Sequence, residues 1–331
     1  MTQPDVSAVI VTYNSAHVIE ACLGALVVDS GTAIDSDTAI EIEVIVYDNA
    51  SSDETVDVVL ERFPTVHVIR GAENLGFAKA VNRAASVACG HNIMLLNPDA
   101  VIDSVSVGVL RDAVPSTRGG VVAPMIEHSS GLVRVVSAGR MPTSWRMFTH
   151  YFGLSRLAEG REWLEGHYCL PSEDLESSPF EADWVTGACL MVDAETWRRM
   201  DGLCERWFMY AEDIEFCWRV GKAGGKVLVQ PAATAQHLVG SSNSEQATHT
   251  NSAWVINLYD FYAADLARNR AQRLWWGVVV SSGLSLRACV FLIQSIVDRR
   301  NAPTHRVSAG RFLEHSRAIA GRTLIYVNTA A

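Results

Sequence analysis

The 331-residue chain is 49% hydrophobic and 19% charged, a composition typical of a folded protein with a sizeable core. Its formal net charge of −10 argues against a general nucleic-acid-binding protein. The seven cysteines include no CxxC pair, which argues against a disulfide framework or a zinc site and predicts reduced thiols in the cytoplasm. The N-terminal sequence has no basic segment of the kind that begins a signal peptide, which also favours the cytoplasm.

Charge is unevenly distributed along the chain. Residues 266–331 contain ten Arg and no Lys against only Asp298 and Glu314, so this segment carries +8 and the remainder −18. A basic tail on an acidic body predicts an anionic partner surface, with a membrane as the leading candidate. We therefore expect a catalytic domain over residues 1–242 and a basic, apolar helical region over residues 243–331.

Strand and helix patterns alternate over the first hundred residues. Short apolar runs predict strands at 7–13, 43–48, 66–70 and 92–100, and capped periodic segments predict helices at 16–27, 51–63 and 74–88. The segment 29–40 is rich in Ser, Thr, Asp and Gly and predicts a flexible loop. This alternation predicts an α/β fold with a mostly parallel central sheet flanked by helices. Ligands of such sheets bind at the carboxyl ends of strands, where Asp48 and Asp99 fall.

A third acidic position occurs in FMYAEDIEFCWR, residues 208–219, where Glu212 and Asp213 adjoin within aromatic and apolar surroundings. Glu215 and Arg219 are spaced to pair at i and i+4 on a helix. Acidic side chains at three strand or loop ends predict a pocket for a cation and a phosphorylated ligand.

Seven motifs occur in a fixed order: IVTYN, VYDNASSD, NLGFAKAVNRA, LLNPDA, VTGACLMV, FMYAEDIEFCWR and AQHLVGSS. Together they resemble the inverting glycosyltransferases of family 2, and within that family the rhamnosyltransferase-like branch, over roughly residues 7–242. The resemblance implies a GT-A fold, which is a Rossmann-like sheet, together with a nucleotide-diphosphate sugar donor and Mg²⁺ or Mn²⁺. It does not by itself prove which sugar is used.

The resemblance also implies the donor side of the site, made of Thr12, Asn14, Asp48, Asn74, Gly76, Asn82 and Asn97. Asp48 would hold the nucleoside, although an Asp at a strand end is also a common turn cap. Glycine and a helix N-terminus at 74–77 suit phosphate. Asp99 and His237 would be the metal ligands, and Asn97 replaces the first acid of the family's DxD triplet with a weaker ligand. Asn-Pro-Asp is equally good turn chemistry, and His237 is equally a lone loop histidine.

Asp213 is the predicted catalytic base, because inversion needs a carboxylate that accepts the proton of the acceptor hydroxyl. Glu212 is the alternative base, and an ordinary acidic helix start explains both residues without catalysis. Trp184, Thr186 and Gly187 are expected on the acceptor side, where small residues leave room for a substrate, although a tightly packed strand accounts for them too. The segment 140–151 is a candidate acceptor loop.

The C-terminal segment 274–297 is strongly apolar and is divided by Arg287 into uncharged pieces of 13 and 10 residues. Each piece is shorter than the roughly 20 residues that span a bilayer. With arginines on both sides, the segment predicts interfacial helices on anionic lipid. The alternatives are a helical hairpin packed on the catalytic domain or on a second copy in a homodimer, and a true membrane span.

The sequence thus predicts a cytoplasmic enzyme, peripheral on the inner face of the plasma membrane. It would move a sugar, with dTDP-L-rhamnose as the first candidate donor and a UDP-sugar as the alternative, to a polyprenyl-diphosphate-linked or polysaccharide acceptor of the cell wall or surface glycan. Two other classes remain open, a nucleotidyltransferase and a non-catalytic glycan-assembly partner. A nucleotidyltransferase would need a Gly-rich, basic first loop, which IVTYNSAH does not provide.

Overall fold

The computed structural model of the chain describes residues 3–27, 40–128, 134–135, 138–158, 161–168, 178–237 and 251–329. The predicted loop 29–40 lies, except for its last residue, outside the described residues. The chain forms two compact units. The first contains residues 1–139 and 171–244, and the second contains residues 140–170 and 245–331.

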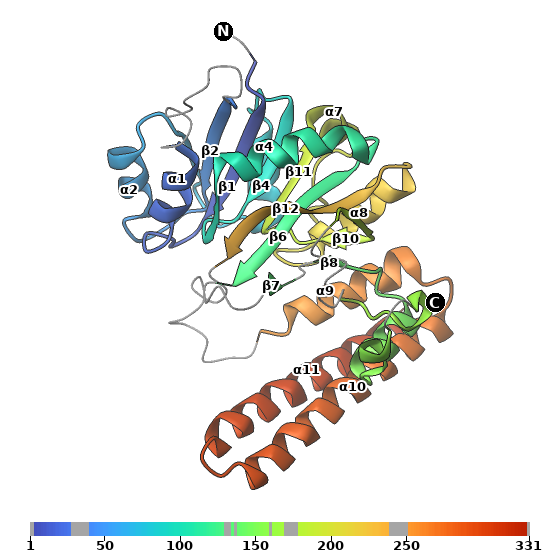
Figure 1. Cartoon of the computed structure of the whole chain (residues 1–331). Coiled ribbons are helices and arrows are strands. Elements are labelled where there is room, and N and C mark those ends of the chain that lie inside the picture. Colours follow the sequence, from blue (N-terminus) through green and yellow to red (C-terminus); the bar gives the residue numbers. More distant parts are fainter. Residues whose placement is uncertain are drawn as a thin grey trace. The chain divides into compact units, whose positions relative to one another are not determined.

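The first unit is built on a mixed ten-stranded sheet in the order β3-β2-β1-β4-β11-β6-β12-β5, with β7 on β6 and β9 on β12 (Figure 1). Its strands are β1 Val6–Thr12, β2 Ile42–Asp48, β3 His67–Arg70, β4 Asn92–Leu96, β5 Ala100–Ile102, β6 Val121–His128, β7 Arg134–Val135, β9 Phe180–Ala182, β11 Cys189–Asp193 and β12 Val227–His237. The four strands β3, β2, β1 and β4 are mutually parallel, as the alternating pattern predicts. β11 then runs antiparallel to β4. Two short strands, β8 Ala138–Gly139 and β10 Trp184–Val185, form a separate antiparallel pair.

Helices cover both faces of this sheet. They are α1 Ile19–Val27, α2 Thr55–Arg62, α3 Phe77–Ala85, α4 Ser104–Ala113 with the 3-10 turn η2 Val114–Thr117, α7 Ala194–Arg199 and α8 Glu212–Lys222. Every residue of β1 is buried, as expected for an inner parallel strand covered on two sides. Alternate β1 residues Val6, Ala8 and Ile10 pack with the α1 residues Ile19 and Leu23 in one hydrophobic cluster. The predicted α/β fold with a mostly parallel sheet is therefore confirmed.

The second unit is helical. It contains α5 Ser144–Tyr151, the short turns η3 Leu154–Leu157 and η4 Glu162–Leu164, α9 Ala253–Phe261 with the π-helical turn η6 Tyr262–Leu266, α10 Arg270–Val297 and α11 Ala302–Thr329. Trp276 is fully buried in it, where its indole lies 5.4 Å from the rings of Tyr259 and Tyr262 and donates to the carbonyl of Pro142 at 2.6 Å. The predicted acceptor segment 140–151 thus contributes a helix to this unit.

Helix α10 runs without a break through Arg287. Among the described helices it is the one long and apolar enough to cross a membrane by length and composition. The guanidinium of Arg287 lies 4.8 Å from the Tyr151 ring centroid, and its Nη2 lies 3.2 Å from Nε2 of His150. Burial lowers the pKa of His150 to about 4, so this imidazole is neutral at pH 7.

Glycines let α10 approach its neighbours closely. A Cβ at Gly277 would lie 2.0 Å from Oγ1 of Thr323 in α11, and one at Gly283 would lie 2.4 Å from Cβ of Tyr151 in α5. Asp260 in α9 accepts two hydrogen bonds from Arg322 in α11, at 2.8 and 2.6 Å. Close backbone packing and this ion pair together hold the helical unit in one arrangement.

We expect Gly277→Ala to destabilise the protein by about 1–3 kcal/mol, because the new methyl group overpacks against the rigid, buried Thr323. Gly321→Ala is the matched control, since nothing lies within 4 Å of a Cβ at that α11 position. Alanine should stabilise that helix by about 0.5–1 kcal/mol. Thermal unfolding midpoints of the two variants should therefore move in opposite directions from the wild type, and a shift in the same direction would contradict the packing described.

Candidate active site

The carboxyl ends of β1 and β2 place Thr12 beside Asp48. The two strands are parallel and these two residues are register partners. Thr12 Oγ1 donates to Asp48 Oδ1 at 3.1 Å, and the backbone N–H of Ser51 donates to Asp48 Oδ2 at 3.0 Å. Both side chains are buried. The Asp48 carboxylate is therefore fixed in orientation at the edge where open α/β sheets bind ligands.

Asn14 joins the loops that follow β1 and β2. It has a positive φ of 52°, a conformation that asparagine tolerates better than most residues. Its Oδ1 accepts from the N–H of Ser52 at 2.8 Å, and its own N–H donates to Ser51 Oγ at 2.9 Å. In this structure Asn14 thus shapes the loop beside Asp48, and its predicted contact with a nucleotide stays a prediction.

Asn49, which the sequence analysis did not single out, ties the β2 loop to the loop before α3. Its Nδ2 donates to Asn74 Oδ1 at 2.8 Å and to the carbonyl of Gly76 at 3.2 Å, and its Oδ1 accepts from the N–H of Leu75 at 2.8 Å. Because the residue is only 3% exposed, its amide needs these partners. Its place directly after Asp48 in VYDNASSD was the available signal.

Gly76 lets the start of α3 contact the segment that precedes α8. Its φ is 83°, and a Cβ there would lie 2.3 Å from the carbonyl oxygen of Phe208. The N–H of Phe77 donates to that same oxygen at 2.8 Å. Glycine is therefore required for both conformation and space, and a backbone hydrogen bond connects two motifs that are 130 residues apart.

Asn82 makes a second connection between α3 and this segment. Its Oδ1 accepts from the N–H of Leu203 and its Nδ2 donates to the carbonyl of Leu203, each at 2.9 Å. Nδ2 also lies 3.0 Å from a carboxylate oxygen of Glu205. The amide is thus engaged with the protein's own backbone, and its predicted role near the donor is untested.

The segment that precedes α8 ends in a strained turn. Tyr210 and Ala211 have φ values of 74° and 76°, so two consecutive non-glycine residues adopt the left-handed conformation. That conformation costs about 1–2 kcal/mol per residue. Glu212 and Asp213 begin the helix immediately after it. Strain of this kind persists only where the surrounding contacts determine it, as the Gly76 contact does here.

Asp213 receives two backbone hydrogen bonds. The N–H of Gly187 donates to Oδ2 at 2.9 Å, and the N–H of Ile214 donates to Oδ1 at 2.8 Å. Burial raises the pKa of Asp213 above its ordinary value, and these two donations oppose the rise. A Cβ at Gly187 would lie 3.5 Å from both Asp213 Cβ and Phe77 Cε1. The predicted acceptor residue, the start of α3 and the predicted base therefore converge.

Glu212 differs from its neighbour. It is 4% exposed, and its Oε2 has no hydrogen-bond partner in the described part of the chain. Burial, followed by the charge of Asp213, raises the pKa of Glu212 to about 8. Glu212 is therefore protonated at neutral pH.

Asp99 and His237 form a second polar pair. β12 runs antiparallel to β5 with His237 opposite Ala100, which brings His237 Nε2 to 3.0 Å from Asp99 Oδ1. Asp99 is 4% exposed and the His237 side chain is 20% exposed. A carboxylate and an imidazole are ligands suited to Mn²⁺. Among the described residues no cluster of three or more His, Cys, Asp or Glu has metal-binding geometry, so the described part of the site contributes this pair alone.

Asn97 connects this pair to the acceptor side. Its N–H donates to the carbonyl of Ala188 at 2.9 Å, and its carbonyl accepts from the N–H of Ala100 at 3.0 Å. Ala188 directly follows Gly187, and its own N–H donates to Thr186 Oγ1 at 3.3 Å. Trp184, in contrast, is 4% exposed within β10.

A series of hydrogen bonds, close approaches and sequence neighbours therefore links the three acidic positions. It runs from Asp48 through Asn49 to Gly76, from Phe77 through Gly187 to Asp213, and from Ala188 through Asn97 to Asp99 and His237. The sequence analysis predicts that the three acidic positions contribute to one pocket. The structure brings them into one region of the first unit.

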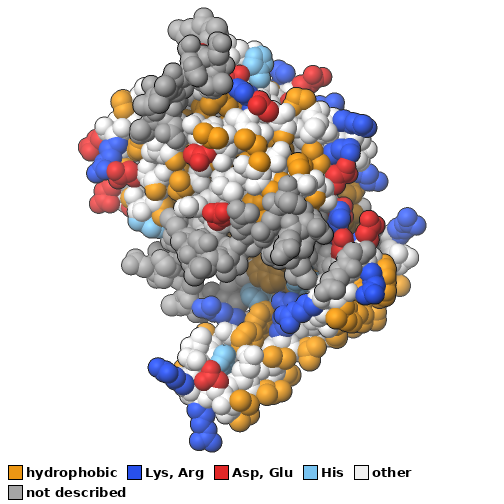
Figure 2. Space-filling model, in the orientation of Figure 1, with side chains coloured by type: hydrophobic (Ala, Val, Ile, Leu, Met, Phe, Trp, Pro, Cys, Tyr) orange, Lys and Arg blue, Asp and Glu red, His pale blue; other side chains and the backbone are white. Residues whose placement is uncertain are grey.

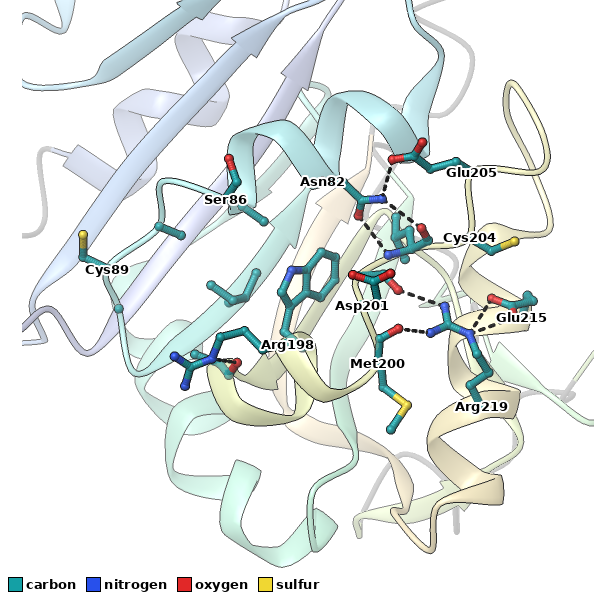
Figure 3. A pocket seen from close by; sticks show the side chains of 18 of the residues that line it. Asn82, Ser86, Cys89, Arg198, Met200, Asp201, Cys204, Glu205, Glu215 and Arg219 are labelled. Atoms are coloured by element: carbon teal, nitrogen blue, oxygen red, sulfur yellow. Dashed lines mark hydrogen bonds and ion pairs between the residues drawn. The ribbon is translucent and has the colours of Figure 1, made fainter.

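A separate hollow of about 980 Å³ lies beside α3, α7 and α8 (Figure 3). Its lining includes Asn82, Trp197 and Arg219 and contains none of the three linked acids among the described residues. Arg219 Nε donates to Glu215 at 2.8 Å, which confirms the predicted pair, and Nη2 donates to the carbonyl of Gly202 at 2.9 Å. The polar groups of this wall thus hold the 200–205 segment in place.

Comparison with known proteins identifies the family. The family model described as glycosyl transferase family 2 matches residues 7–166. An N-acetylglucosaminyl-diphospho-decaprenol L-rhamnosyltransferase of Mycobacterium tuberculosis is 30% identical over 221 residues, 63% of this chain and 70% of the relative. A low-salt glycan biosynthesis hexosyltransferase, Agl10 of Haloferax volcanii, is 26% identical over 219 residues, 65% of this chain and 61% of the relative.

A solved structure supports the fold. The mannosyltransferase PcManGT of Pyrobaculum calidifontis, in complex with GDP-Man and Mn²⁺, superposes with a TM-score of 0.56 at 16% identity. The match covers 98% of this chain and 88% of that one. On the family match, the M. tuberculosis relative and the arrangement of the acidic motifs, the chain belongs to glycosyl transferase family 2 and is a glycosyltransferase.

Proposed function

We propose that this glycosyltransferase inverts the anomeric centre of a sugar that it moves from a nucleotide-diphosphate donor to a polyprenyl-diphosphate-linked or polysaccharide acceptor in the synthesis of a cell-wall or surface glycan. The donor proposed first is dTDP-L-rhamnose, in line with the name of the M. tuberculosis relative. The observation that carries the proposal is the contact series that joins Asp48, Asp213 and Asp99. The enzyme would work at the inner face of the plasma membrane, where a polyprenyl-linked acceptor is accessible.

The donor side follows from the fixed carboxylate of Asp48. Its orientation by Thr12 and Ser51 suits a hydrogen bond to the nucleoside. The loop at Asn74 and Gly76, held by Asn49, would carry the diphosphate close to the backbone at the start of α3.

Asp99 and His237 would hold a divalent cation, Mg²⁺ or Mn²⁺, with Asn97 nearby as a neutral oxygen ligand. When bound, such an ion supplies positive charge that stabilises the leaving diphosphate. Beyond these two ligands of the described residues, the diphosphate would supply further oxygen ligands to the cation. We therefore expect cation affinity to depend strongly on the nucleotide.

Asp213 is the proposed base. Its carboxylate accepts the proton of the acceptor hydroxyl as that oxygen bonds to the anomeric carbon and the bond from that carbon to the diphosphate oxygen breaks. The N–H of Gly187 donates to this carboxylate and fixes its direction. The raised pKa of Asp213 brings its basicity nearer to the working pH.

Donor binding is tested by thermal shift with dTDP-rhamnose, dTDP, UDP-sugars and Mn²⁺, Mg²⁺ or EDTA. Saturation at a hundredfold excess over Kd should stabilise the protein by about 2.7 kcal/mol. The shift should require a divalent cation and should fall in Asp48→Ala and in Asp99→Ala, but not in Asp57→Ala, which removes an exposed carboxylate of α2. A shift with UDP-sugars alone would replace rhamnose and keep the enzyme class, and no shift with any nucleotide would overturn the donor site.

The base is tested by comparing Asp213→Asn with Glu212→Gln. Loss of a general base costs about 10²–10⁴ in rate, so Asp213→Asn should lower kcat by at least a hundredfold while donor binding persists. Glu212→Gln should keep kcat within a few-fold near pH 7, because Gln resembles the protonated Glu212 that burial already favours. The reverse order of losses would assign the base to Glu212.

Glu212 should also make stability depend on pH. Because its folded pKa of about 8 is above the ordinary value of 4.5, the folded state holds more protons between these values, and rising pH lowers the free energy of unfolding there. Glu212→Gln removes this loss. Its thermal midpoint should exceed that of the wild type by about 2 °C or more at pH 8 and by much less at pH 5. An equal difference at both pH values would show that Glu212 ionises normally.

A further inference from the structure

An uncharged apolar stripe runs along the outer face of α10. At 100° per residue, its side chains fall within an arc of about 120°. They are between 44% and 80% exposed: Trp275, Val278, Leu286, Val290, Ile293, Ile296 and Val297. Ser282 and the exposed Cys289 lie on the same arc without adding a charge, and the buried Val279 interrupts it near its N-terminal end. The stripe is about 33 Å long at 1.5 Å per residue.

The stripe is not the face by which α10 packs into the core of the second unit. Trp276, Val280, Leu284 and Ala288 are fully buried on the other side of the helix. The helix therefore satisfies its packing in the second unit and still presents large apolar side chains outward. An exposed patch of this size is typical of a surface that binds a partner or a membrane.

Arginines occur at both ends of α10 and along α11. Those that are exposed make no ion pair within the described part of the chain: Arg268, Arg270, Arg299, Arg300, Arg306, Arg311 and Arg317. Arg299 and Arg300 follow directly on Ile296 and Val297, the most exposed apolar side chains of the helix. Figure 2 shows hydrophobic side chains along the helical pair, with basic ones at its end. Apolar surface bordered by unpaired positive charge matches the chemistry of an anionic bilayer.

The charge also argues against a second copy of the chain as the occupant. A two-fold interface places the same patch of both copies together, which would bring two sets of unpaired arginines into proximity. Repulsion between them would oppose association, whereas anionic lipid would neutralise them.

The position of Arg287 distinguishes docking from spanning. It lies near the middle of α10, where a span would place a charge at the costly centre of the bilayer. Its guanidinium is instead held by Tyr151 and His150 of α5 within the unit. The close contacts at Gly277 and Gly283 would also have to separate before α10 could insert alone.

We propose that α10 lies in the plane of an anionic membrane, with the stripe inserted among the acyl chains and the exposed arginines on lipid phosphates. This inference specifies the surface behind the proposed membrane location and is independent of the donor sugar. A helix of this kind would keep the enzyme at the surface where lipid-linked acceptors are found.

Flotation of the full-length protein with phosphatidylcholine vesicles, with and without phosphatidylglycerol, tests the docking. We expect binding only to the anionic vesicles. The double variant Ile293→Glu with Ile296→Glu should lose at least tenfold in affinity. Arg299→Gln with Arg300→Gln should lose about thirtyfold, since each arginine contributes about 1 kcal/mol near such a surface. Val105→Glu, at a 74% exposed position of α4, is the control and should bind normally.

Depth is measured with an environment-sensitive dye on Cys289, whose signal is identified by its loss in Cys289→Ser. Its emission should shift to the blue on anionic vesicles, and alkaline carbonate should still extract the protein. Resistance to extraction would indicate a membrane span. If the wild type binds no vesicles and sediments as a dimer, and the Ile293/Ile296 variant sediments as a monomer, the stripe would bind a second copy of the chain. Either result, or no binding to anionic vesicles at low salt, would overturn the proposal. If the protein binds anionic vesicles but shows no thermal shift with any nucleotide, the membrane proposal holds and the donor proposal fails.

Discussion

The candidate site depends on backbone groups that reach across the sequence to hold buried carboxylates. The N–H of Gly187 donates to Asp213, and the carbonyl of Phe208 accepts from Phe77 at the start of α3. The second contact requires a glycine at 76, because a Cβ there would lie 2.3 Å from the Phe208 carbonyl oxygen. Because a buried carboxylate is stable only when its oxygens are hydrogen-bonded, these contacts decide where α8 begins and which way Asp213 points.

The acidic pair at the start of α8 shows how two neighbouring carboxyl groups come to differ. Asp213 accepts two backbone hydrogen bonds, whereas one oxygen of Glu212 is buried without a partner in the described structure. Burial raises the pKa values of both, and backbone hydrogen bonds oppose the rise at each residue. The two carboxyl groups are therefore held differently, and the strained turn at Tyr210 and Ala211 places both at the helix start.

The helical unit also depends on glycines that allow close packing. Its apolar helix α10 is continuous and would look like a membrane span by length alone. Glycine-mediated packing on α11 and α5 buries one face, and Arg287 finds aromatic and imidazole partners inside the unit. What remains outside is a stripe whose chemistry suits a lipid surface. The segment 140–170 belongs to this unit because α5 packs there, although in sequence it interrupts the first unit.

The sequence by itself determined the local elements and the motif positions. Buried β-branched runs predicted the parallel strands β1 to β4, and the ordered motifs identified the family, because both signals reside in neighbouring residues. The tertiary structure alone decided the rest. Four features depend on residues that are far apart in the chain. They are the antiparallel insertion of β11, the hydrogen bonds of Asn49 to the loop before α3, the approach of Phe77 and Gly187 to Asp213, and the division of α10 into a packed face and an exposed face. Short-range periodicity carries no information about such distant partners.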